Sequence, residues 1–316
     1  MLELKALLLT QGMHGMVSQV EGLAKALGLS YKHQKIELKS FWNLVPPKIS
    51  PISENLVKNK FVCDCKIIIS CGRKSVIPSA YLKKRFKKAI ISIHIQDPKI
   101  SIKNFDFVIV PEHDDLKGKN VLISKGAIHY LKDEELNQCK DYLKDKITKE
   151  KVVSFIVGGP NKYFEYNTKF LKNLFFKIEN NFIKKGYQLI FVPSFRTPKN
   201  VIDIAKKYFD TNQIIIDSID KKAYLSSLKL ADHIVVTSDS TSMISEAAIT
   251  GKPIYVAHMP IIRKNSRFNN FFRLFKSLNI IQDLENSVDT WSYKKLNETD
   301  RISKYIKQQI KNYEFS

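Results

Sequence analysis

Residues 233–248 read HIVVTSDSTSMISEAA, a short β-branched run that passes directly into hydroxyl side chains and then into a helical pattern. The run at 233–237 predicts a buried strand, and Asp239 or Ser240 is suited to cap the helix that follows. One cap residue suffices for an ordinary helix, whereas four of the five residues at 238–242 carry hydroxyls. We therefore interpret this junction as a binding site for a diphosphate, held by backbone N–H groups and hydroxyls.

The helix after this junction carries a candidate nucleotide contact. Ser242 and Met243 lie in its first turn, and Glu246 lies about one turn further on. Because carboxylate oxygens accept hydrogen bonds, we expect Glu246 to contact the ribose hydroxyls of a nucleotide. The alternative is an ordinary capped helix on which Glu246 is a solvated charge.

Strand and helix alternate along the whole chain. Strands are predicted at 6–10, 66–70, 89–95, 107–110 and 121–124, and again at 152–157, 188–192, 213–216, 233–237 and 254–257. Helices are predicted at 16–27, 76–88, 163–185, 198–209, 222–230, 241–250 and 299–313. This pattern predicts an α/β fold with parallel sheets. A charged stretch at 133–151 separates the two sets of strands, so we expect Rossmann-like domains at 1–147 and 148–316.

The chain carries a formal net charge of +21 that is spread over both of its halves. A nucleic-acid-binding arm concentrates its charge on one segment or face, so we expect no nucleic-acid partner. The charge favours anionic partners, namely a phosphorylated or lipid-linked substrate and an anionic membrane surface. A general compositional bias toward lysine, asparagine and isoleucine is the alternative explanation.

No apolar run reaches the roughly 20 residues of a membrane span, and the N-terminus lacks the pattern of a secretion signal. The four cysteines form no CxxC pair and have no histidine pair at ligand spacing, so we expect no metal and no other cofactor. These features predict a cytoplasmic protein that is either soluble or peripherally associated with the cytoplasmic face of a membrane. A stripe at helical spacing is the candidate for that contact, with a core stripe as the alternative: Phe268, Phe271, Phe272, Phe275 and Leu278.

Ligands of parallel sheets bind at the carboxyl ends of strands, so the loops at these ends are candidate sites. In the first domain, Gly12 and Gly15 permit a tight turn after the first strand, and Gln19 follows in the next helix. Gly72 and Arg73 follow a second strand, and Arg73 is a candidate for binding a carboxylate or phosphate. A solvated arginine at a loop tip is the alternative.

Two side chains of the first domain are candidate bases. Asp97, which follows Gln96 after a strand, could take a proton from an acceptor hydroxyl, although Asp before Pro is also ordinary turn chemistry. His14 in the first loop is the second candidate.

Two loops of the second domain are candidate phosphate sites. Gly158 and Gly159 follow a strand and precede Asn161, which makes an anion cradle plausible at the start of a helix. After the next strand come Ser194, Arg196 and Thr197, whose side chains commonly bind phosphates or bases.

Together these loops resemble the "elongated mitochondria" fission-factor family and its bacterial relatives, which are regarded as glycosyltransferases. The resemblance runs from about residue 5 to residue 260 and rests on the loop around Gly12 together with SCGRKS (70–75), IQDP (95–98), FDFVIVPEH (105–113), GAIH (126–129), GGPN (158–161), PSFRTP (193–198), TSDSTSM (237–243) and SEA (245–247). The sequence departs from the family at Gln11, where an acidic residue is usual, and at Lys99, where an arginine is usual.

The resemblance implies a GT-B architecture, in which two Rossmann-like domains face each other across a cleft and a last helix returns to the first domain. It implies a donor pocket formed by Gly159, Asn161, Ser194, Arg196, Thr197, Ser240, Ser242, Met243 and Glu246. It implies an acceptor or sugar side formed by Gly12, Gly15, Gln19, Arg73, Gln96 and Asp97.

The function expected on this basis is metal-independent transfer of a sugar from a nucleoside-diphosphate donor to a hydroxyl acceptor such as an envelope glycolipid. Arg196 and the helix start at Ser240 would stabilise the leaving diphosphate. Two alternatives remain open: a nucleotide-sugar epimerase on the same fold, and a non-catalytic, membrane-associated scaffold.

Overall fold

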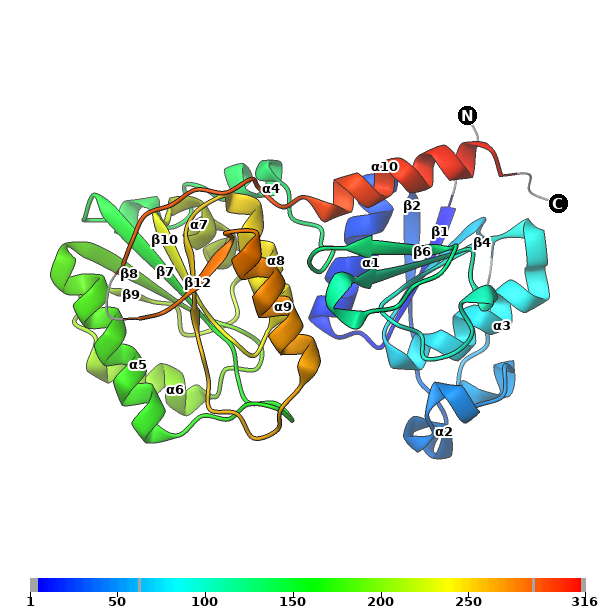
Figure 1. Ribbon diagram of the computed structural model, residues 1–316, viewed down its shortest axis with the longest axis horizontal. Helices are drawn as coiled ribbons and strands as arrows, with labels where there is room; N and C mark the ends of the chain where they lie inside the picture. The colour runs from blue at the N-terminus through cyan, green and yellow to red at the C-terminus, as the bar shows by residue number, and fades with distance from the viewer. Residues whose placement is uncertain (1–4, 62–63, 286–287, 314–316) are drawn as a thin grey trace. The chain divides into compact units, whose positions relative to one another are not determined.

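The computed structural model describes residues 5–61, 64–285 and 288–313, and the chain divides into two compact units. The N-terminal unit comprises residues 1–130 and 297–316, and the C-terminal unit comprises residues 131–296. Each unit has its own sheet with helices packed against it (Figure 1).

The N-terminal sheet is parallel throughout, with the strand order β2-β1-β3-β4-β5-β6. Its strands are β1 (Lys5–Thr10), β2 (Ser30–Lys35), β3 (Ile67–Cys71), β4 (Ile91–Ile95), β5 (Phe107–Pro111) and β6 (Val121–Ser124). Its helices are α1 (His14–Leu27), α2 (Ser40–Leu44), α3 (Val76–Phe86) and α10 (Glu298–Lys311).

Both faces of this sheet are covered. Leu23 of α1 and Ile302 of α10 join one buried cluster with Leu8 of β1. Ile77 of α3 joins a separate cluster with Leu9 of the same strand. Because successive side chains of a strand point to opposite faces, the two clusters lie on opposite sides of β1.

The last helix belongs to the N-terminal unit, to which the chain returns after the whole C-terminal unit. The Thr299 hydroxyl accepts a hydrogen bond from the His129 N–H at 3.0 Å and donates one to the His129 carbonyl at 2.8 Å. On α1, a Cβ at Gly22 would lie 2.4 Å from the His129 carbonyl carbon. A glycine at that position therefore lets the segment around His129 lie against the helix.

The C-terminal sheet is also parallel, with the strand order β12-β11-β10-β7-β8-β9. Its strands are β7 (Lys151–Val157), β8 (Tyr187–Pro193), β9 (Ile214–Ile215), β10 (His233–Thr237), β11 (Ile254–Ala257) and β12 (Ile281–Asp283). Its helices are α4 (Asp133–Gln138), α5 (Thr168–Asn181), α6 (Lys199–Tyr208), α7 (Lys221–Leu230), α8 (Thr241–Ala247) and α9 (Ser266–Ser277).

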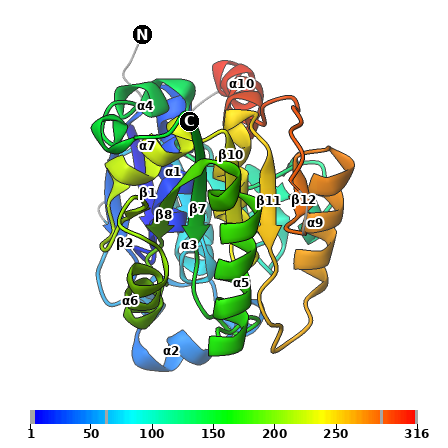
Figure 2. The same cartoon turned by 90° about the vertical axis from the view of Figure 1, so that its left-hand side faces the viewer.

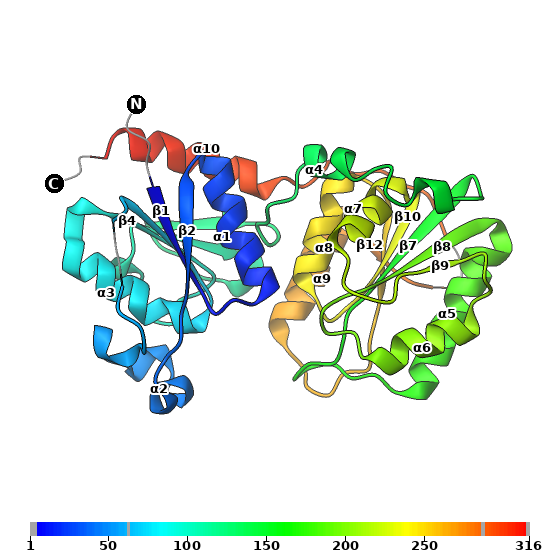
Figure 3. The same cartoon turned by 180° about the vertical axis from the view of Figure 1, so that it is seen from behind.

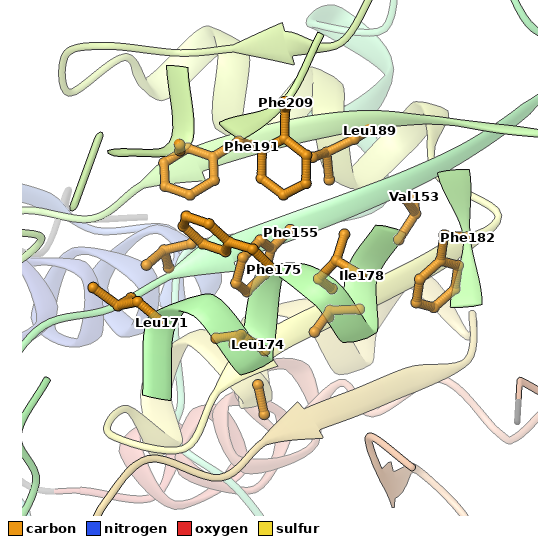
Figure 4. Packing of buried hydrophobic residues seen from close by; sticks show 14 of the residues in the cluster. Val153, Phe155, Leu171, Leu174, Phe175, Ile178, Phe182, Leu189, Phe191 and Phe209 are labelled. Carbon is orange, nitrogen blue, oxygen red and sulfur yellow. The ribbon is translucent and has the colours of Figure 1, made fainter. Parts of the chain in front are cut away.

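Aromatic side chains fill the core between this sheet and helices α5 and α6, which lie in front of the sheet in Figure 2. Phe155 of β7 and Phe191 of β8 meet edge to face, with ring centroids 5.6 Å apart, and Phe175 of α5 packs on both (Figure 4). Such geometry is favourable beyond the buried area alone.

The predicted α/β class with parallel sheets is confirmed, but two strands and one boundary differ from expectation. β2 and β12 were not predicted because each lies at a sheet edge and lacks a continuous apolar run. The units divide at residue 130 rather than near 148, because the connecting segment packs on α7: the Leu143 N–H donates to the Ser226 hydroxyl at 3.1 Å.

The aromatic stripe considered for membrane contact lies mostly in the core. Phe271 and Phe275 of α9 are fully buried, and their rings lie 4.1 Å apart. Phe272 is also buried, and Phe268 packs edge to face on Phe164. The stripe is thus explained mostly by the packing of α9, and the interpretation as a membrane contact is wrong for the buried side chains of Phe271, Phe272 and Phe275.

Candidate functional site

Three loops with polar side chains meet at the carboxyl edge of the C-terminal sheet. They follow β7, β8 and β10, which are adjacent strands in the sheet order. Because the strands are parallel, their carboxyl ends lie along the same edge. The loops carry Gly158, Gly159 and Asn161, then Ser194, Arg196 and Thr197, and finally Ser238, Asp239 and Ser240.

The carboxylate of Asp239 joins these loops. Its side chain is fully buried, and Oδ1 accepts a hydrogen bond from the Thr237 hydroxyl at 2.7 Å. Oδ2 accepts one from the Gly159 N–H at 3.2 Å and forms an ion pair with the Arg196 guanidinium. One buried charge therefore binds a group from each of the loops, and its cost of burial is offset by these partners.

The two glycines after β7 are explained by close approach to this network. A Cβ at Gly158 would lie 2.0 Å from Asp239 Oδ1, and a Cβ at Gly159 would lie 1.8 Å from the Arg196 carbonyl oxygen. No larger residue fits either position without moving a loop. The glycines do not open a helix as expected, because α5 begins only at Thr168, with Asn167 as its N-cap.

Ser194 and Thr197 fix the turn after β8. The Thr197 hydroxyl donates to the carbonyls of Val157, at 2.6 Å, and Gly158, at 2.9 Å, and accepts from the Ser194 N–H at 2.8 Å. The Ser194 hydroxyl accepts from the Arg196 N–H at 3.3 Å. Among the described residues, Nη2 is the one side-chain nitrogen of Arg196 with an acceptor, so the other guanidinium donors are available to a ligand.

Asn161 and Tyr166 complete the loop after β7. Asn161 Oδ1 accepts from the N–H groups of Tyr163, at 2.8 Å, and Phe164, at 3.2 Å, and its Nδ2 donates to the Asp239 carbonyl at 3.3 Å. The Tyr166 hydroxyl, which sequence reasoning missed, donates to the Gly158 carbonyl at 3.1 Å. Burial and the charge of Asp239 raise the pKa of Tyr166, so its hydroxyl stays protonated.

Ser240, rather than Asp239, caps α8, because its hydroxyl accepts from the Met243 N–H at 3.3 Å. Ser242 and Met243 lie in the first turn and are partly exposed. Glu246 is neither solvated nor exposed: its side chain is buried, and Oε2 accepts a hydrogen bond from the Tyr224 hydroxyl of α7 at 2.8 Å. The solvated-charge interpretation of Glu246 is therefore wrong.

One ionisable cluster at this edge was not singled out from the sequence. His258 follows β11, and its Nε2 lies 2.6 Å from Asp283 Oδ1, while Lys276 Nζ lies 2.5 Å from Oδ2. Burial favours a raised pKa for Asp283, but the hydrogen bonds from Lys276 and His258 outweigh it, and the pKa is lowered. His258 and Asp283 lie far apart in the sequence, so no local pattern predicts that they form a pair.

The glycine loops of the N-terminal unit also meet at a sheet edge. Gly12 and Gly72 both have positive φ, of 83° and 90°, and a Cβ at Gly72 would lie 2.5 Å from Met16 Sδ. Gly15 has nothing within 4 Å of its Cβ position, so close packing does not explain it. Gln19 is buried and donates to the Gly15 carbonyl at 3.0 Å, which makes it a support for the loop.

Arg73 is exposed, and one nitrogen of its guanidinium is anchored to the backbone. Its Nη2 donates to three consecutive carbonyls, those of Asn43, Leu44 and Val45, at 3.2, 3.1 and 2.9 Å. These carbonyls lie at the end of α2, where a helix leaves acceptors without intrahelical partners. Arg73 thus has a structural role at the end of α2, and anion binding by its remaining guanidinium donors stays a prediction.

The two candidate bases differ in their surroundings. Asp97 is paired with Lys99, whose Nζ lies 2.5 Å from Oδ2 and whose N–H donates to Oδ1 at 2.8 Å. His14 is the first residue of α1 and is exposed. Gln96 adopts a φ of 85°, which is uncommon for a residue with a side chain, and its N–H donates to the Ile109 carbonyl at 2.8 Å.

The described residues contain neither a metal-binding cluster nor a membrane-spanning helix. Within residues 5–61, 64–285 and 288–313, no three His, Cys, Asp or Glu side chains are grouped so as to hold a metal ion. In the same residues, no helix combines the length and apolar character needed to cross a bilayer. Cys63 lies outside the described residues; Cys71 and Cys139 are free thiols.

Two relatives are recognisable by sequence. Mitochondrial fission protein ELM1 of Arabidopsis thaliana is 25% identical over 272 residues, which cover 77% of this chain and 64% of that protein, so the chain spans less than two thirds of its length. An uncharacterised protein of Rickettsia prowazekii (strain Madrid E) is 28% identical over 285 residues, which cover 78% of this chain and 80% of the relative.

Solved structures share the fold. UDP-GlcNAc 2-epimerase from Neisseria meningitidis, bound to UDP-GlcNAc, superposes with a TM-score of 0.55 at 12% identity, over 98% of this chain and 100% of the epimerase. A glycotransferase of kitacinnamycin gives a TM-score of 0.52 at 11% identity, over 98% and 94% of the two chains. The predicted two-domain, GT-B-like fold is thus confirmed.

The family described as "Mitochondrial fission ELM1" matches residues 14–310, which is nearly the whole chain. This match confirms the resemblance that the strand-end loops indicated. The chain belongs to the mitochondrial fission ELM1 family.

Proposed function

We propose that the C-terminal unit binds a nucleoside-diphosphate sugar at the carboxyl ends of β7, β8 and β10. The proposal rests on one observation: the buried carboxylate of Asp239 holds three polar loops together at that edge. Parallel α/β sheets bind nucleotides at this edge. The Neisseria epimerase, which shares the fold, was solved with UDP-GlcNAc bound.

The reaction proposed is transfer of the sugar to a hydroxyl acceptor, without a metal. The bond between C1 of the sugar and the β-phosphate oxygen breaks, a bond forms between C1 and the acceptor oxygen, and the acceptor proton passes to a base. The diphosphate leaves with additional negative charge, which Arg196 and the N–H groups near Ser240 would stabilise. The net positive charge of the protein suits a phosphorylated or lipid-linked acceptor, such as an envelope glycolipid.

The remaining donor-side residues have defined places in this proposal. Gly158 and Gly159 let the loops close together, Asn161, Ser194 and Thr197 hold their conformation, and Ser242 and Met243 flank the bound nucleotide. Glu246 contacts the ribose while the Tyr224 hydroxyl orients its carboxylate.

His14 is the preferred base, because it is exposed at the start of α1, whereas Asp97 is paired with Lys99. On the acceptor side, the loops that contain Gly12, Gly15, Gly72 and Gln96 offer backbone groups to the acceptor. Gln19 acts indirectly, through the Gly15 carbonyl, whereas Arg73 holds the end of α2 and offers its remaining guanidinium donors to an anionic acceptor.

The test is to incubate the protein with a panel of nucleotide sugars and to analyse the products by NMR or chromatography. A transferase releases a nucleoside diphosphate, slowly with water and faster with a suitable hydroxyl acceptor. An epimerase converts the donor to an isomeric sugar without an acceptor, and that result would replace the proposed reaction on the same site. If none of the nucleotide sugars is converted and no nucleotide binds, both proposed reactions are contradicted and a non-catalytic scaffold is favoured.

A further inference from the structure

The segment from Ser40 to Ile49, which we call the α2 loop, exposes large apolar side chains to solvent. Phe41 is 68% exposed, Leu44 is 83% exposed and Ile49 is 71% exposed. Among the described residues, Phe195 is the one further large apolar side chain that is more than two-thirds exposed. Such a concentration within ten residues is unusual for a surface without a partner.

Phe41 and Leu44 share one face of α2, because residues three apart on a helix are neighbours. Ile49 follows in the 3-10 turn Pro47–Ile49. In Figures 1 and 3, α2 lies apart from the sheet of its own unit, at the end of a projecting segment.

The α2 loop is nevertheless tied to the body of the N-terminal unit. Trp42 packs against the buried cluster that contains Leu38 and Leu56, and Leu38 forms a β-bridge with Val57. The Lys39 N–H donates to the Leu56 carbonyl at 2.9 Å. These contacts hold the base of the loop, so its apolar side chains are presented outward on a fixed support.

Arg73 holds the far end of α2 through its three carbonyl contacts. Pro46 and Pro47 follow at once and restrict the backbone further. A flexible segment could fold its apolar side chains inward, whereas this one is restrained from doing so. The exposure of Phe41, Leu44 and Ile49 is therefore a built feature of the unit.

The charges around these side chains are positive. Lys39 and Lys48 flank them and are exposed, and no aspartate or glutamate occurs between Glu37 and Glu54. The chain as a whole has a net charge of +21. Apolar and aromatic side chains bordered by lysines match an anionic bilayer surface, where acyl chains lie directly below phosphate groups.

We propose that the α2 loop docks the protein on the surface of an anionic lipid bilayer. Phe41, Leu44 and Ile49 enter the boundary between headgroups and acyl chains, and Lys39 and Lys48 contact lipid phosphates. Trp42 lies at the base of the loop, and indole rings favour the interface between membrane and water. This inference does not depend on the proposed function, since it concerns another surface and another ligand.

The experiment is vesicle flotation with the full chain, comparing phosphatidylcholine vesicles with equimolar phosphatidylcholine–phosphatidylserine vesicles. The wild type binds the anionic vesicles and far less the neutral ones. The triple variant Phe41→Ser/Leu44→Ser/Ile49→Ser binds at least about tenfold more weakly. An effect of that size requires the loss of only ~55 Å² of apolar contact with the bilayer. Each of Lys39→Gln and Lys48→Gln weakens binding about fivefold.

Matched controls come from the C-terminal unit. Phe176 and Ile219 are 55% and 58% exposed, and Phe176→Ser and Ile219→Ser leave the affinity for vesicles unchanged. Lys185→Gln and Lys207→Gln, also at exposed positions, change it less than Lys39→Gln or Lys48→Gln. A loss of equal size in the control variants would overturn the assignment to the α2 loop.

A second readout does not depend on the apolar substitutions. Trp42 and Trp291 are the only tryptophans of the sequence, so Trp291→Phe leaves Trp42 as the one indole emitter. Lipids brominated near the headgroup quench Trp42 when the loop docks. Vesicle binding without such quenching would assign docking to another surface, and no binding to anionic vesicles would overturn the proposal.

Discussion

Arg196 forms an ion pair with Asp239, whose carboxylate is fully buried and also accepts hydrogen bonds from Thr237 and Gly159. The sequence places these two residues in separate loops, and it predicted Asp239 as a candidate helix cap and Arg196 as a contact of the diphosphate. In the structure, Asp239 is the support and Arg196 is the group that remains partly exposed. A phosphate near Arg196 would therefore meet a guanidinium that is already held in position.

Removal of either member of this pair should destabilise the C-terminal unit. We expect Arg196→Ala to lower its free energy of unfolding by about 2–3 kcal/mol, less than for a fully buried pair because Arg196 is partly exposed. Arg196→Lys keeps the charge and should cost about 1 kcal/mol or less. Urea unfolding followed by Trp291, which packs against the core of this unit, measures both values in a Trp42→Phe background. Equal stability of wild type and Arg196→Ala would show that the pair contributes nothing.

Two glycine substitutions should show which glycine is required by close packing and which is not. Gly159→Ala places a Cβ on the Arg196 carbonyl, and forcing the loops apart should cost about 1–3 kcal/mol. Gly15→Ala meets nothing within 4 Å and should leave stability unchanged or raise it by about 0.5–1 kcal/mol, since it lies in α1. Thermal unfolding of the two variants is the measurement. A stable Gly159→Ala protein with intact nucleotide binding would contradict the packing explanation.

These cases indicate how far the sequence could predict this molecule. Residues 233–248 were sufficient to predict β10 and the start of α8, because strand periodicity and helix caps are local. β2 and β12 were not predictable, because edge strands need little apolar character and gain their hydrogen bonds from a neighbour that is distant in sequence. The roles of Arg73 and Asp239 depend on partners in other loops, which no local pattern records.

The pH dependence of stability should carry a contribution from His94. This residue is fully buried, its Nδ1 lies 2.8 Å from the Ser70 hydroxyl, and its Nε2 has no hydrogen-bond partner among the described residues. Burial lowers its pKa from 6.5 to about 3, against a small opposing effect of Asp97. Between these values the unfolded chain binds the proton and the folded chain does not, so stability is lost as the pH falls below about 6.5.

The expected loss approaches about 1.4 kcal/mol for each pH unit well below pH 6.5. In His94→Asn this contribution should be absent, so the free energy of unfolding should fall less steeply between pH 6.5 and pH 5. Urea titrations of both proteins across that range give the comparison. Parallel pH profiles would mean that His94 takes up a proton in the folded state as readily as in the unfolded one.

The aromatic stripe of α9 should behave as core. Phe271→Ala and Phe275→Ala each remove a fully buried ring and should cost about 3–5 kcal/mol of stability. Mild variants such as Phe275→Leu, which stay folded, should bind vesicles as the wild type does. A selective loss of vesicle binding in Phe275→Leu, without a change in stability, would return the membrane role to this helix.

The most direct measurement is calorimetric titration of the full chain with UDP, GDP, ADP, CMP and dTDP in the presence of EDTA. The account predicts saturable binding of one of these nucleotides without a metal, at least about tenfold weaker in Arg196→Lys, whose ammonium cannot reproduce the guanidinium contacts. His14→Asn, in the other unit, should bind that nucleotide as the wild type does. If none of the five nucleotides binds, or if Arg196→Lys binds as tightly as the wild type, the proposed donor site at Asp239 and Arg196 is contradicted.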